Sequence, residues 1–407
     1  MKIRLAQINP TVGDINGNTD LIIKTIQSSP EGSIVVFPEL SITGYPPQDL
    51  LLDSGFITKV EESLDLIRQN TEMRTVVVGL PRYSGCELYN SAAIISNGNI
   101  LGYHDKVLLP TYDVFDENRY FKPSNRIEPF KVSLDGKSIV LGIQICEDLW
   151  DEDYDHNISE TLIEKGAEMI INISASPYRK NIISKRLNLC IDKSSHLKYN
   201  FIYCNMVGAQ DELVFDGRSF IINSSGEVEA MGSAFNEDII DFDTESLSSI
   251  RSNQKLVKQP EELYMALSLG VGDYFQKSNF SKAVIGLSGG IDSALTAAIA
   301  TQAIGSDNVI GISMPSKFSS QHSKDDAESL ANNLGIKFES IPINKIFNQL
   351  LSEMGTFFDE TESGLAEENL QARIRGNILM SIANKINALV LNTGNKTELA
   401  LGYCTMY

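Results

Sequence analysis

Apolar positions recur along this chain in two rhythms that predict different architectures. In the first 250 residues they form short runs of strand length, at 2–8, 33–37, 74–79, 90–96, 99–106, 139–146, 168–173, 200–206 and 215–223. Segments with helical spacing lie between these runs, at 18–28, 53–70, 157–166 and 182–199. This half is expected to be an α/β layer structure with a mixed sheet.

The second rhythm begins near residue 261, where a helix is expected. Strands then alternate with helices, at 283–287, 308–314, 337–343 and 388–392. Such alternation predicts a doubly wound, Rossmann-like parallel sheet with ligands at the carboxyl ends of its strands. Residues 225–260 are rich in acids and serines without strong periodicity, which predicts final hairpins and then a linker. We expect a first domain at 1–250, a linker and first helix at 251–282, and a second domain at 283–407.

Composition excludes several classes of protein. The 407 residues are 42% hydrophobic and 21% charged, as in ordinary globular proteins, and the chain is long enough for two or three domains. A net charge of −19 argues against nucleic-acid and anionic-membrane partners, since both require basic surfaces. Residues 1–8 alternate polar with apolar side chains, which predicts a first strand and no signal peptide. No segment approaches transmembrane length.

The five cysteines are scattered and form no Cys-x-x-Cys pair, which argues against a zinc site or a disulfide framework. A reducing cytoplasm is therefore the expected location. Four of the five are interpreted as packing residues: Cys86, Cys190, Cys204 and Cys404.

One stretch of the second half carries a phosphate-binding pattern. The apolar run 283–287 predicts a buried strand, which the turn Ser288-Gly289-Gly290-Ile291-Asp292-Ser293 connects to an alanine-rich helix. Adjacent glycines allow backbone N–H groups to approach a ligand, and the following helix N-terminus favours an anion. Asp292 suits a phosphate site only if a divalent metal lies between the two. The stretch predicts a nucleotide site with a metal.

The hexapeptide 288–293 resembles the signature of the ATP pyrophosphatases, which hold pyrophosphate and transfer AMP to an acceptor oxygen. It is not of the Walker type, because no Gly-Lys-Ser/Thr closes the loop. The resemblance implies ATP as co-substrate and Mg²⁺ as the metal.

Three reactive side chains end apolar strands in the first half. These are Glu39, Lys106 and Cys146. A cysteine becomes a useful nucleophile beside a base such as a glutamate of raised pKa. A lysine and the backbone N–H of Glu147 can together stabilise a tetrahedral oxyanion. From spacing alone, a packing role for the cysteine and solvated strand-end roles for the other two remain open.

The segments around these residues resemble, in the right order, the three catalytic motifs of the nitrilase (carbon–nitrogen hydrolase) superfamily. They are Phe37-Pro38-Glu39-Leu40, 104–110 and 144–150, and the resemblance covers about residues 1–250. It implies a four-layer αββα sandwich with Glu39 as general base, Lys106 as oxyanion stabiliser and Cys146 as the nucleophile that forms a thioester. Glu117 matches the supporting glutamate of that superfamily.

A nitrilase half followed by an ATP pyrophosphatase half resembles the glutamine-dependent NAD⁺ synthetase family. The resemblance implies that glutamine is hydrolysed to ammonia, which amidates deamido-NAD⁺ after ATP has adenylated it. The segments 368–376 and 391–403 resemble the remaining synthetase motifs. The implied ATP contacts are Gly286, Ser288, Gly289, Gly290, Asp292, Ser293, Met314 and Thr393. Asn369 and Glu398 are implied for deamido-NAD⁺, Asp292 and Glu398 for the metal, and Tyr112 and Ser176 for glutamine.

Several positions depart from the family pattern or stay open. Ile182 stands where the family usually has a lysine, so Arg179, Lys180 or Lys185 replaces it or the glutamine carboxylate is held differently. One of Arg373 and Arg375 is expected to point inward, with a solvated helix face as the alternative for both. The chain ends inside a motif that continues in the family, so a truncated synthetase is expected.

Two other functions remain as alternatives. One is a different amidotransferase with a pyrophosphatase domain, although those related to GMP or asparagine synthetases use unrelated glutaminase domains. The other is a non-catalytic or glutaminase-only homologue. Tunnels that cross subunits in the family suggest a homo-oligomer.

Overall fold

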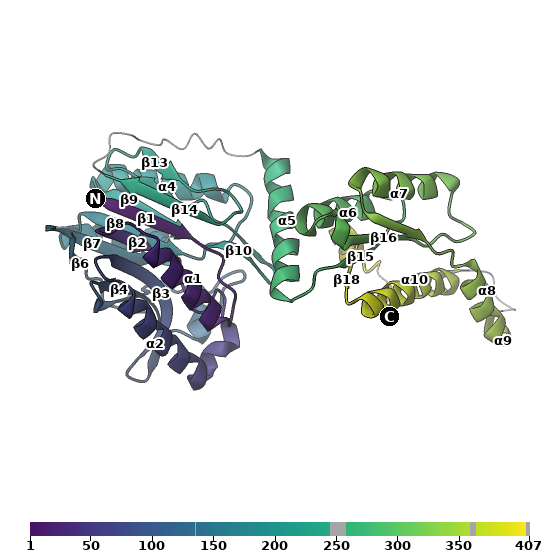
Figure 1. Cartoon of the computed structure of the whole chain (residues 1–407), viewed down its shortest axis with the longest axis horizontal. Helices are drawn as coiled ribbons and strands as arrows, with labels where there is room; N and C mark the ends of the chain where they lie inside the picture. The colour runs from purple at the N-terminus through teal and green to yellow at the C-terminus, as the bar shows by residue number, and fades with distance from the viewer. Residues whose placement is uncertain (135, 245–257, 359–363, 404–407) are drawn as a thin grey trace. The chain divides into compact units, whose positions relative to one another are not determined.

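The structure is a computed structural model that describes residues 1–134, 136–244, 258–358 and 364–403 (Figure 1). The chain divides into two compact units, Met1–Glu262 and Leu263–Tyr407. Each unit is described by itself. Part of the expected linker, at 251–257, lies outside the described residues.

Two six-stranded mixed sheets build the first unit. One has the order β14 (Asp238–Asp243), β1 (Lys2–Gln7), β2 (Ser33–Val36), β3 (Thr75–Ser84), β4 (Glu87–Ser96), β5 (Asn99–Asp105). The other has the order β13 (Val228–Met231), β12 (Phe220–Ile222), β9 (Asn200–Asn205), β8 (Met169–Ser174), β7 (Lys137–Ile145), β6 (Phe130–Leu134). A separate hairpin joins β10 (Val207–Gln210) to β11 (Leu213–Asp216).

The two sheets pack face to face and helices cover their outer faces. Alternating side chains supply the central core, with Leu5 and Val36 from one sheet beside Ile143 and Ile171 from the other. Helices α1 (Ile15–Gln27) and α2 (Ser54–Gln69) pack on the first sheet, and α3 (Ile158–Glu164) and α4 (Ile182–Leu197) on the second (Figure 1). The expected four-layer αββα sandwich is confirmed.

The structure corrects some element boundaries. The single strand expected at 215–223 is two strands, because Gly217 and Arg218 have φ values of 64° and 55° and turn the chain between β11 and β12. The helix expected at 18–28 begins at Ile15, where the Asp14 side chain accepts a hydrogen bond from the Gly17 N–H and caps it. Strands β6 and β10 were not predicted.

The second unit contains one parallel sheet with helices on both faces. Its order is β17 (Lys337–Ser340), β16 (Val309–Ser313), β15 (Ala283–Gly286), β18 (Leu389–Leu391). Helices α6 (Ile291–Ile304) and α7 (Gln321–Leu334) pack on one face, and α8 (Asn344–Glu353) and α10 (Leu365–Ile386) on the other. Helix α5 (Gln259–Lys277) precedes the sheet, and α9 (Gly355–Phe358) and α11 (Lys396–Leu401) are short. The doubly wound arrangement is confirmed.

This strand order locates the ligand-binding edge of the second unit. Strands β16 and β17 lie on one side of β15, whereas β18 lies on its other side. The strand order therefore reverses direction at β15, and the boundary between β15 and β18 is the topological switch point of the sheet. Ligands of open α/β sheets bind at the carboxyl ends of the strands beside such a reversal. The glycine turn at 288–290 follows β15 at this point.

The cysteines follow their expected burial with one exception. Cys190 and Cys204 are buried, as predicted for packing residues. Cys86 is exposed in the turn between β3 and β4, so its packing prediction is wrong. Cys404 lies outside the described residues. Across the described parts of the chain, no helix is long and apolar enough to cross a membrane.

Gly79 controls the position of the loop that carries Glu39. A Cβ at Gly79 on β3 would lie 2.4 Å from the Leu40 nitrogen and 2.7 Å from the Pro38 oxygen, both of them backbone atoms that cannot rotate away. We expect Gly79→Ala to lower the free energy of unfolding by about 2 kcal/mol, as overpacking does. Urea unfolding measures this. Gly272→Ala in α5 is the control, because its nearest neighbours lie at 3.5 Å or more, and an equal loss there would contradict the prediction.

Candidate functional site

Glu39, Lys106 and Glu117 form one buried ion cluster in the first unit. Glu39 follows β2, Lys106 directly follows β5, and Glu117 begins the short 3₁₀ helix η2 (Glu117–Arg119). Lys106 Nζ donates to Glu39 Oε1 at 2.7 Å and to the two Glu117 carboxylate oxygens at 2.9 Å each. These three residues are spread over 78 positions of the sequence, from Glu39 to Glu117, and the fold brings them together.

Three further groups hold the two carboxylates in place. Asn90 Nδ2 donates to Glu39 Oε1 at 2.8 Å, and the backbone N–H of Ala175 donates to Glu39 Oε2 at 2.9 Å. The Tyr45 hydroxyl donates to Glu117 Oε1 at 3.0 Å. The sequence analysis did not identify these groups. The signal for Asn90 was a polar amide directly before the small and apolar residues of β4.

Burial and charge together set the protonation of this cluster. Burial alone would lower the pKa of Lys106, but Glu117 and Glu39 hold that pKa well above its usual value, so the amine stays an ammonium. Burial raises the pKa of Glu117 from 4.5 to about 7, against the lowering effect of Lys106 and together with the raising effect of Glu39. The carboxylates of Glu39 and Glu117 share the single ammonium of Lys106, so one positive charge balances two acidic groups.

Cys146 lies on a strained turn at the end of β7. Its backbone φ is 44°, in the left-handed region that non-glycine residues rarely occupy, and only 8% of the residue is exposed. Burial raises the pKa of the Cys146 thiol well above its usual value, and nearby Glu39 raises it further, while Lys106 opposes both. The resting sulfur therefore carries a proton, and a base must remove it before it can attack a carbonyl.

Glu147, next to Cys146, was considered in the sequence analysis only for its backbone N–H. Its buried carboxylate accepts hydrogen bonds from the Tyr112 hydroxyl at 2.9 Å and from the Tyr154 hydroxyl at 3.1 Å. Burial raises the pKa of this carboxyl. An acid placed here can receive a cationic group of a ligand. Tyr112 itself is half exposed, so it lies at the rim of the site.

Ser176 lies beside a different cation from those that the sequence suggested. Arg186 Nη2 donates to Ser176 Oγ at 3.0 Å and to the Ser176 carbonyl oxygen at 2.8 Å, and its Nη1 pairs with Asp216 at 2.7 Å. Ile182, in the place of the family lysine, is buried at the start of α4. The three alternatives proposed for that lysine are exposed: Arg179, Lys180 and Lys185.

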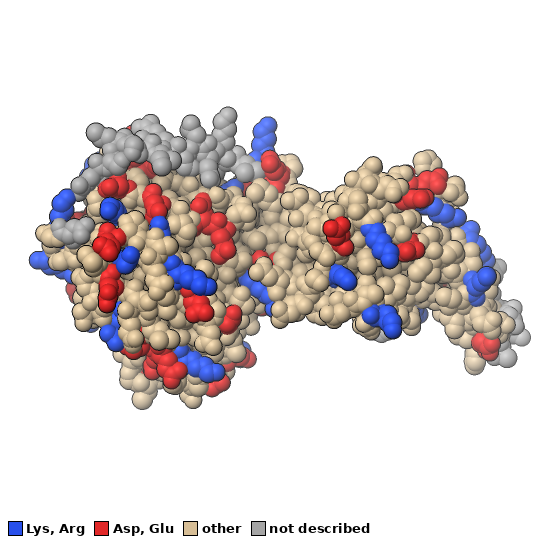
Figure 2. All heavy atoms as spheres, viewed as in Figure 1, with Lys and Arg blue, Asp and Glu red and all other residues tan. Residues whose placement is uncertain are grey.

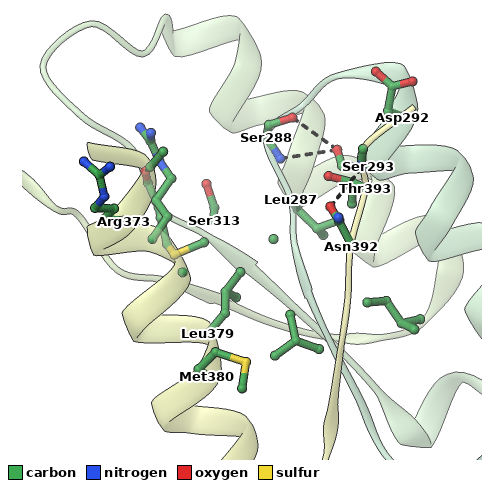
Figure 3. Close-up of a pocket in the computed structure, with 18 of the residues that line it drawn as sticks. Leu287, Ser288, Asp292, Ser293, Ser313, Arg373, Leu379, Met380, Asn392 and Thr393 are labelled. Carbon is green, nitrogen blue, oxygen red and sulfur yellow. Dashed lines mark hydrogen bonds between the residues drawn. The ribbon is translucent and has the colours of Figure 1, made fainter. Parts of the chain in front are cut away.

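A cavity of about 1390 Å³ lies at the carboxyl ends of the strands in the second unit (Figure 3). Of the residues that the sequence analysis assigned there, those that line it are Gly286, Ser288, Asp292, Ser293, Met314, Thr393 and Glu398. Gly289, Gly290 and Asn369 are not among the described residues of its wall.

The glycine turn is locked by local hydrogen bonds. Ser293 Oγ accepts from the Ser288 N–H at 3.3 Å (Figure 3). It also donates to the Gly290 carbonyl at 2.9 Å. Gly289 has a φ of 80°, and a Cβ there would lie 2.3 Å from the Ser323 carbonyl oxygen of α7, so only glycine fits. The turn therefore presents its backbone at the N-terminus of α6, where an anion is favoured.

Cationic side chains line the same cavity. Arg373 and Arg375 of α10 both face it, whereas only one of them was expected to point inward. Arg375 Nε donates to the Met314 carbonyl at 3.2 Å, and burial lowers the pKa of Arg375. Lys324 on α7, which the sequence analysis missed, also lines the wall. These cations suit a polyanionic ligand.

The acids of the cavity fit magnesium by their chemistry. Asp292 and Glu398 both line it, and Glu398 also accepts the Asn395 N–H at 3.0 Å as part of the α11 cap. Among the described residues there is no cluster of three or more side chains that could ligate a metal. Mg²⁺ is bound typically by one or two carboxylates, with phosphate oxygens and waters completing its shell.

Family models match both units of the chain. The carbon–nitrogen hydrolase model matches residues 2–251, and the NAD synthase model matches residues 263–407. The glutamine-dependent NAD(+) synthetase of Synechocystis is 43% identical over the whole of this chain, which covers 76% of that protein. The enzyme of the same name from Aquifex aeolicus is 40% identical, with 77% of it covered. This chain belongs to the glutamine-dependent NAD⁺ synthetase family.

A solved member of the family has the same fold. The glutamine-dependent NAD⁺ synthetase of Acinetobacter baumannii, determined in complex with ADP, superposes with a TM-score of 0.92 at 35% identity, and the match covers all of this chain and 77% of that one. Full-length similarity to this family favours it over the other pyrophosphatase-linked amidotransferases that the sequence left open.

The raised pKa of Glu117 makes stability depend on pH. The folded state holds this proton more tightly than the unfolded state, so the contribution of Glu117 is fully present below pH 4.5 and is lost as the pH rises through about 7. We expect the stability of the wild type relative to Glu117→Gln, which cannot ionise, to fall by as much as about 3 kcal/mol across this window. Urea unfolding of both proteins from pH 4.5 to 8 measures it. A difference that does not change with pH would contradict the prediction.

Proposed function

We propose that this chain hydrolyses glutamine at Cys146 and passes the ammonia to ATP-activated deamido-NAD⁺, giving NAD⁺, AMP and pyrophosphate. The observation that carries the proposal is the buried Glu39–Lys106–Glu117 cluster beside a strained cysteine, in a chain whose second unit has a glycine turn at a nucleotide-sized cavity. Family membership supports the coupling of the two reactions.

The first unit supplies an acyl-transfer mechanism. Glu39 takes the proton of the Cys146 thiol as the sulfur attacks the carboxamide carbon of glutamine. The Lys106 ammonium and the Glu147 backbone N–H stabilise the oxyanion of the tetrahedral intermediate. Glu39 then gives its proton to the leaving nitrogen, which releases ammonia and leaves a glutamyl thioester. A water deprotonated by Glu39 hydrolyses the thioester to glutamate.

Glutamine is oriented by the groups around the nucleophile. The Glu147 carboxylate, held by Tyr112 and Tyr154, binds the α-ammonium group of the substrate. Ser176, fixed by Arg186, binds the amino-acid end from the other side. These contacts place the carboxamide at the sulfur, which is where orientation contributes to rate.

The second unit activates a carboxylate, which is otherwise a poor acyl donor. The turn 288–290 and Ser293 bind the phosphates of ATP, and Met314 and Thr393 bind the rest of the nucleotide. Asn369 and Glu398 bind deamido-NAD⁺. Its nicotinate carboxylate attacks the α-phosphorus of ATP, pyrophosphate leaves, and ammonia then displaces AMP. Asp292 and Glu398 would hold Mg²⁺, which would supply neutralisation of the phosphate charge.

The remaining properties belong to the same proposal. Residues 1–250 form the glutaminase domain, 251–282 the linker and first helix, and 283–407 the synthetase domain. We place the protein in the cytoplasm as a homo-oligomer without nucleic-acid or membrane partners. The net charge of −19 supports the absence of nucleic-acid and anionic-membrane partners. On the face drawn in Figure 2, acidic side chains lie among the basic ones.

The two half-reactions should be separable by mutation. With glutamine, ATP, Mg²⁺ and deamido-NAD⁺, we expect glutamate and NAD⁺ from the wild type. Cys146→Ala should lose glutamine-dependent NAD⁺ formation by about 10³-fold or more and keep ammonia-dependent formation. Asp292→Asn should lose NAD⁺ formation with either donor and keep glutamate release. Cys190→Ala, at another buried cysteine, is the control. If the wild type makes neither product, the proposal is wrong.

Glutamine recognition by Glu147 has its own test. Glu147→Gln keeps the shape of the side chain and removes its charge, so we expect KM for glutamine to rise about 10- to 100-fold with a smaller change in kcat. Steady-state glutaminase assays measure this. Glu152→Gln, at an exposed acid in the same segment, is the control. An unchanged KM in Glu147→Gln would show that the ammonium group binds elsewhere.

A further inference from the structure

Asp148 binds the backbone of two loops that come from different sheets. Its Oδ1 accepts the N–H groups of Val107 at 3.0 Å and Leu108 at 2.9 Å, the two residues that follow Lys106. Its Oδ2 accepts the N–H of Ile145 at 3.0 Å, the residue before Cys146. The side chain is fully buried. One carboxylate thus links the backbone that follows Lys106, the proposed oxyanion stabiliser, to the backbone that precedes Cys146, the proposed nucleophile.

His104 completes the environment of this carboxylate. Its Nε2 lies 3.1 Å from Asp148 Oδ2, and both side chains are buried. Because the carboxylate can only accept, this contact assigns the proton to Nε2. Lys106 is two residues after His104, so β5 and its loop are attached to Asp148 at both ends of the segment that presents the ammonium.

The same carboxylate constrains the strained turn at the nucleophile. Cys146 has a left-handed φ of 44°, which costs of order 1–3 kcal/mol and persists only where the surroundings enforce it. Asp148 accepts the N–H that immediately precedes this residue and so caps the 3₁₀ helix η3 (Cys146–Leu149). Its removal would free the turn to relax and move the sulfur.

We propose that Asp148 is a positioning residue that sets the distance between the Lys106 ammonium and the Cys146 sulfur. This inference rests on the proposed glutaminase function of the same site. Lys106 directly follows a strand of the first sheet and Cys146 directly follows a strand of the second, so their relative placement depends on contacts between the loops. A misplacement of about 1 Å costs on the order of 10²-fold in rate.

The role requires a carboxylate. Four donors meet its two oxygens: three backbone N–H groups and the His104 ring. An asparagine has one acceptor oxygen and one amide nitrogen. Its NH₂ group would face either the N–H groups of Val107 and Leu108 or the N–H of Ile145, and two donors cannot form a hydrogen bond with each other. Asp148→Asn therefore keeps the volume of the side chain and breaks one half of the link.

Asp151 provides a matched control three residues further along the chain. It is also a buried acid that accepts a backbone N–H, that of Ile158 at 2.9 Å, and it pairs with Lys193. It does not join the loops that carry Lys106 and Cys146. Asp151→Asn removes a comparable buried charge, so it measures the effect of general destabilisation on activity.

The experiment compares full-length wild type, Asp148→Asn and Asp151→Asn. Glutaminase kcat and KM, melting temperature, and the rate at which iodoacetamide alkylates Cys146, followed by peptide mass spectrometry, are measured for each. We expect Asp148→Asn to lose about 10²-fold in kcat with KM changed less than threefold. Its alkylation should slow about tenfold, because Lys106 no longer stabilises the thiolate as well. Asp151→Asn should lower the melting temperature and keep kcat within about twofold.

A second pair of variants decides the question if Asp148→Asn does not fold. His104→Ala removes one donor to the carboxylate and should lower kcat about tenfold. His104→Gln, whose amide nitrogen can take the place of Nε2, should recover most of that loss. Equal kcat in Ala, Gln and wild type would overturn the proposal, as would an Asp148→Asn kcat within threefold of the Asp151→Asn value.

Failure of the function and failure of this inference give different results. If the wild type releases no glutamate, the proposed function is wrong, but slower alkylation in Asp148→Asn than in Asp151→Asn would still support the positioning of Lys106 and Cys146. If the wild type is active and the two aspartate variants behave alike, the positioning role is wrong and the function stands.

Discussion

The first unit depends on one ammonium group that two carboxylates share in a dry pocket. Lys106 donates to Glu39 and Glu117, and all three side chains are almost completely buried. Removing such charges from water costs several kcal/mol per ion, and mutual attraction repays this only with good geometry and further hydrogen bonds. Asn90, Tyr45 and the Ala175 N–H supply those bonds. The arrangement gains little stability, so we attribute it to chemistry.

Burial and the charges of this cluster together determine the protonation of the Cys146 thiol. Two carboxylates and one ammonium leave an excess of negative charge beside Cys146, and together with burial this raises the pKa of the thiol. Burial raises the pKa of Glu117 as well, with a further raising effect from Glu39 and a lowering effect from Lys106. A protonated thiol is protected from adventitious oxidation and alkylation, which attack the thiolate.

The two units differ in where their proposed sites place charged side chains. The first unit buries the charged groups of its site and fixes them by hydrogen bonds, as at Glu39, Lys106 and Glu117, which suits a small substrate whose reacting atom must be placed accurately. The second unit lines an open cavity with the glycine turn, two arginines and a lysine, and among the described residues of its wall the acids are Asp292 and Glu398. That combination suits a large polyanion whose charge is spread over several phosphates. The negative net charge of the chain does not prevent this, because Lys324, Arg373 and Arg375 lie in the cavity wall itself.

Local patterns in the sequence predicted most of the elements and the reactive side chains at the strand ends. Strand-length apolar runs ending in Glu39, Lys106 and Cys146 predicted a layered α/β unit, and the turn at 288–293 after a buried strand predicted a phosphate site, because alternation and glycine spacing are local properties. The fold class and the two-part architecture followed from these patterns. The separate strands β11 and β12 did not, since the positive φ of Arg218 is set by its surroundings.

Only the tertiary structure decided which groups meet. Asn90 and Ala175 are 51 and 136 residues from Glu39 yet bind its carboxylate, and Asp148 binds a loop 40 residues away. Ser176 is held by Arg186, ten residues further along the chain, although Arg179, Lys180 and Lys185 are closer to it in sequence. Such contacts arise between strands that are neighbours in space and distant in sequence, so no local pattern encodes them. The sequence names the reactive groups, and the packing of two sheets fixes their distances and their protonation.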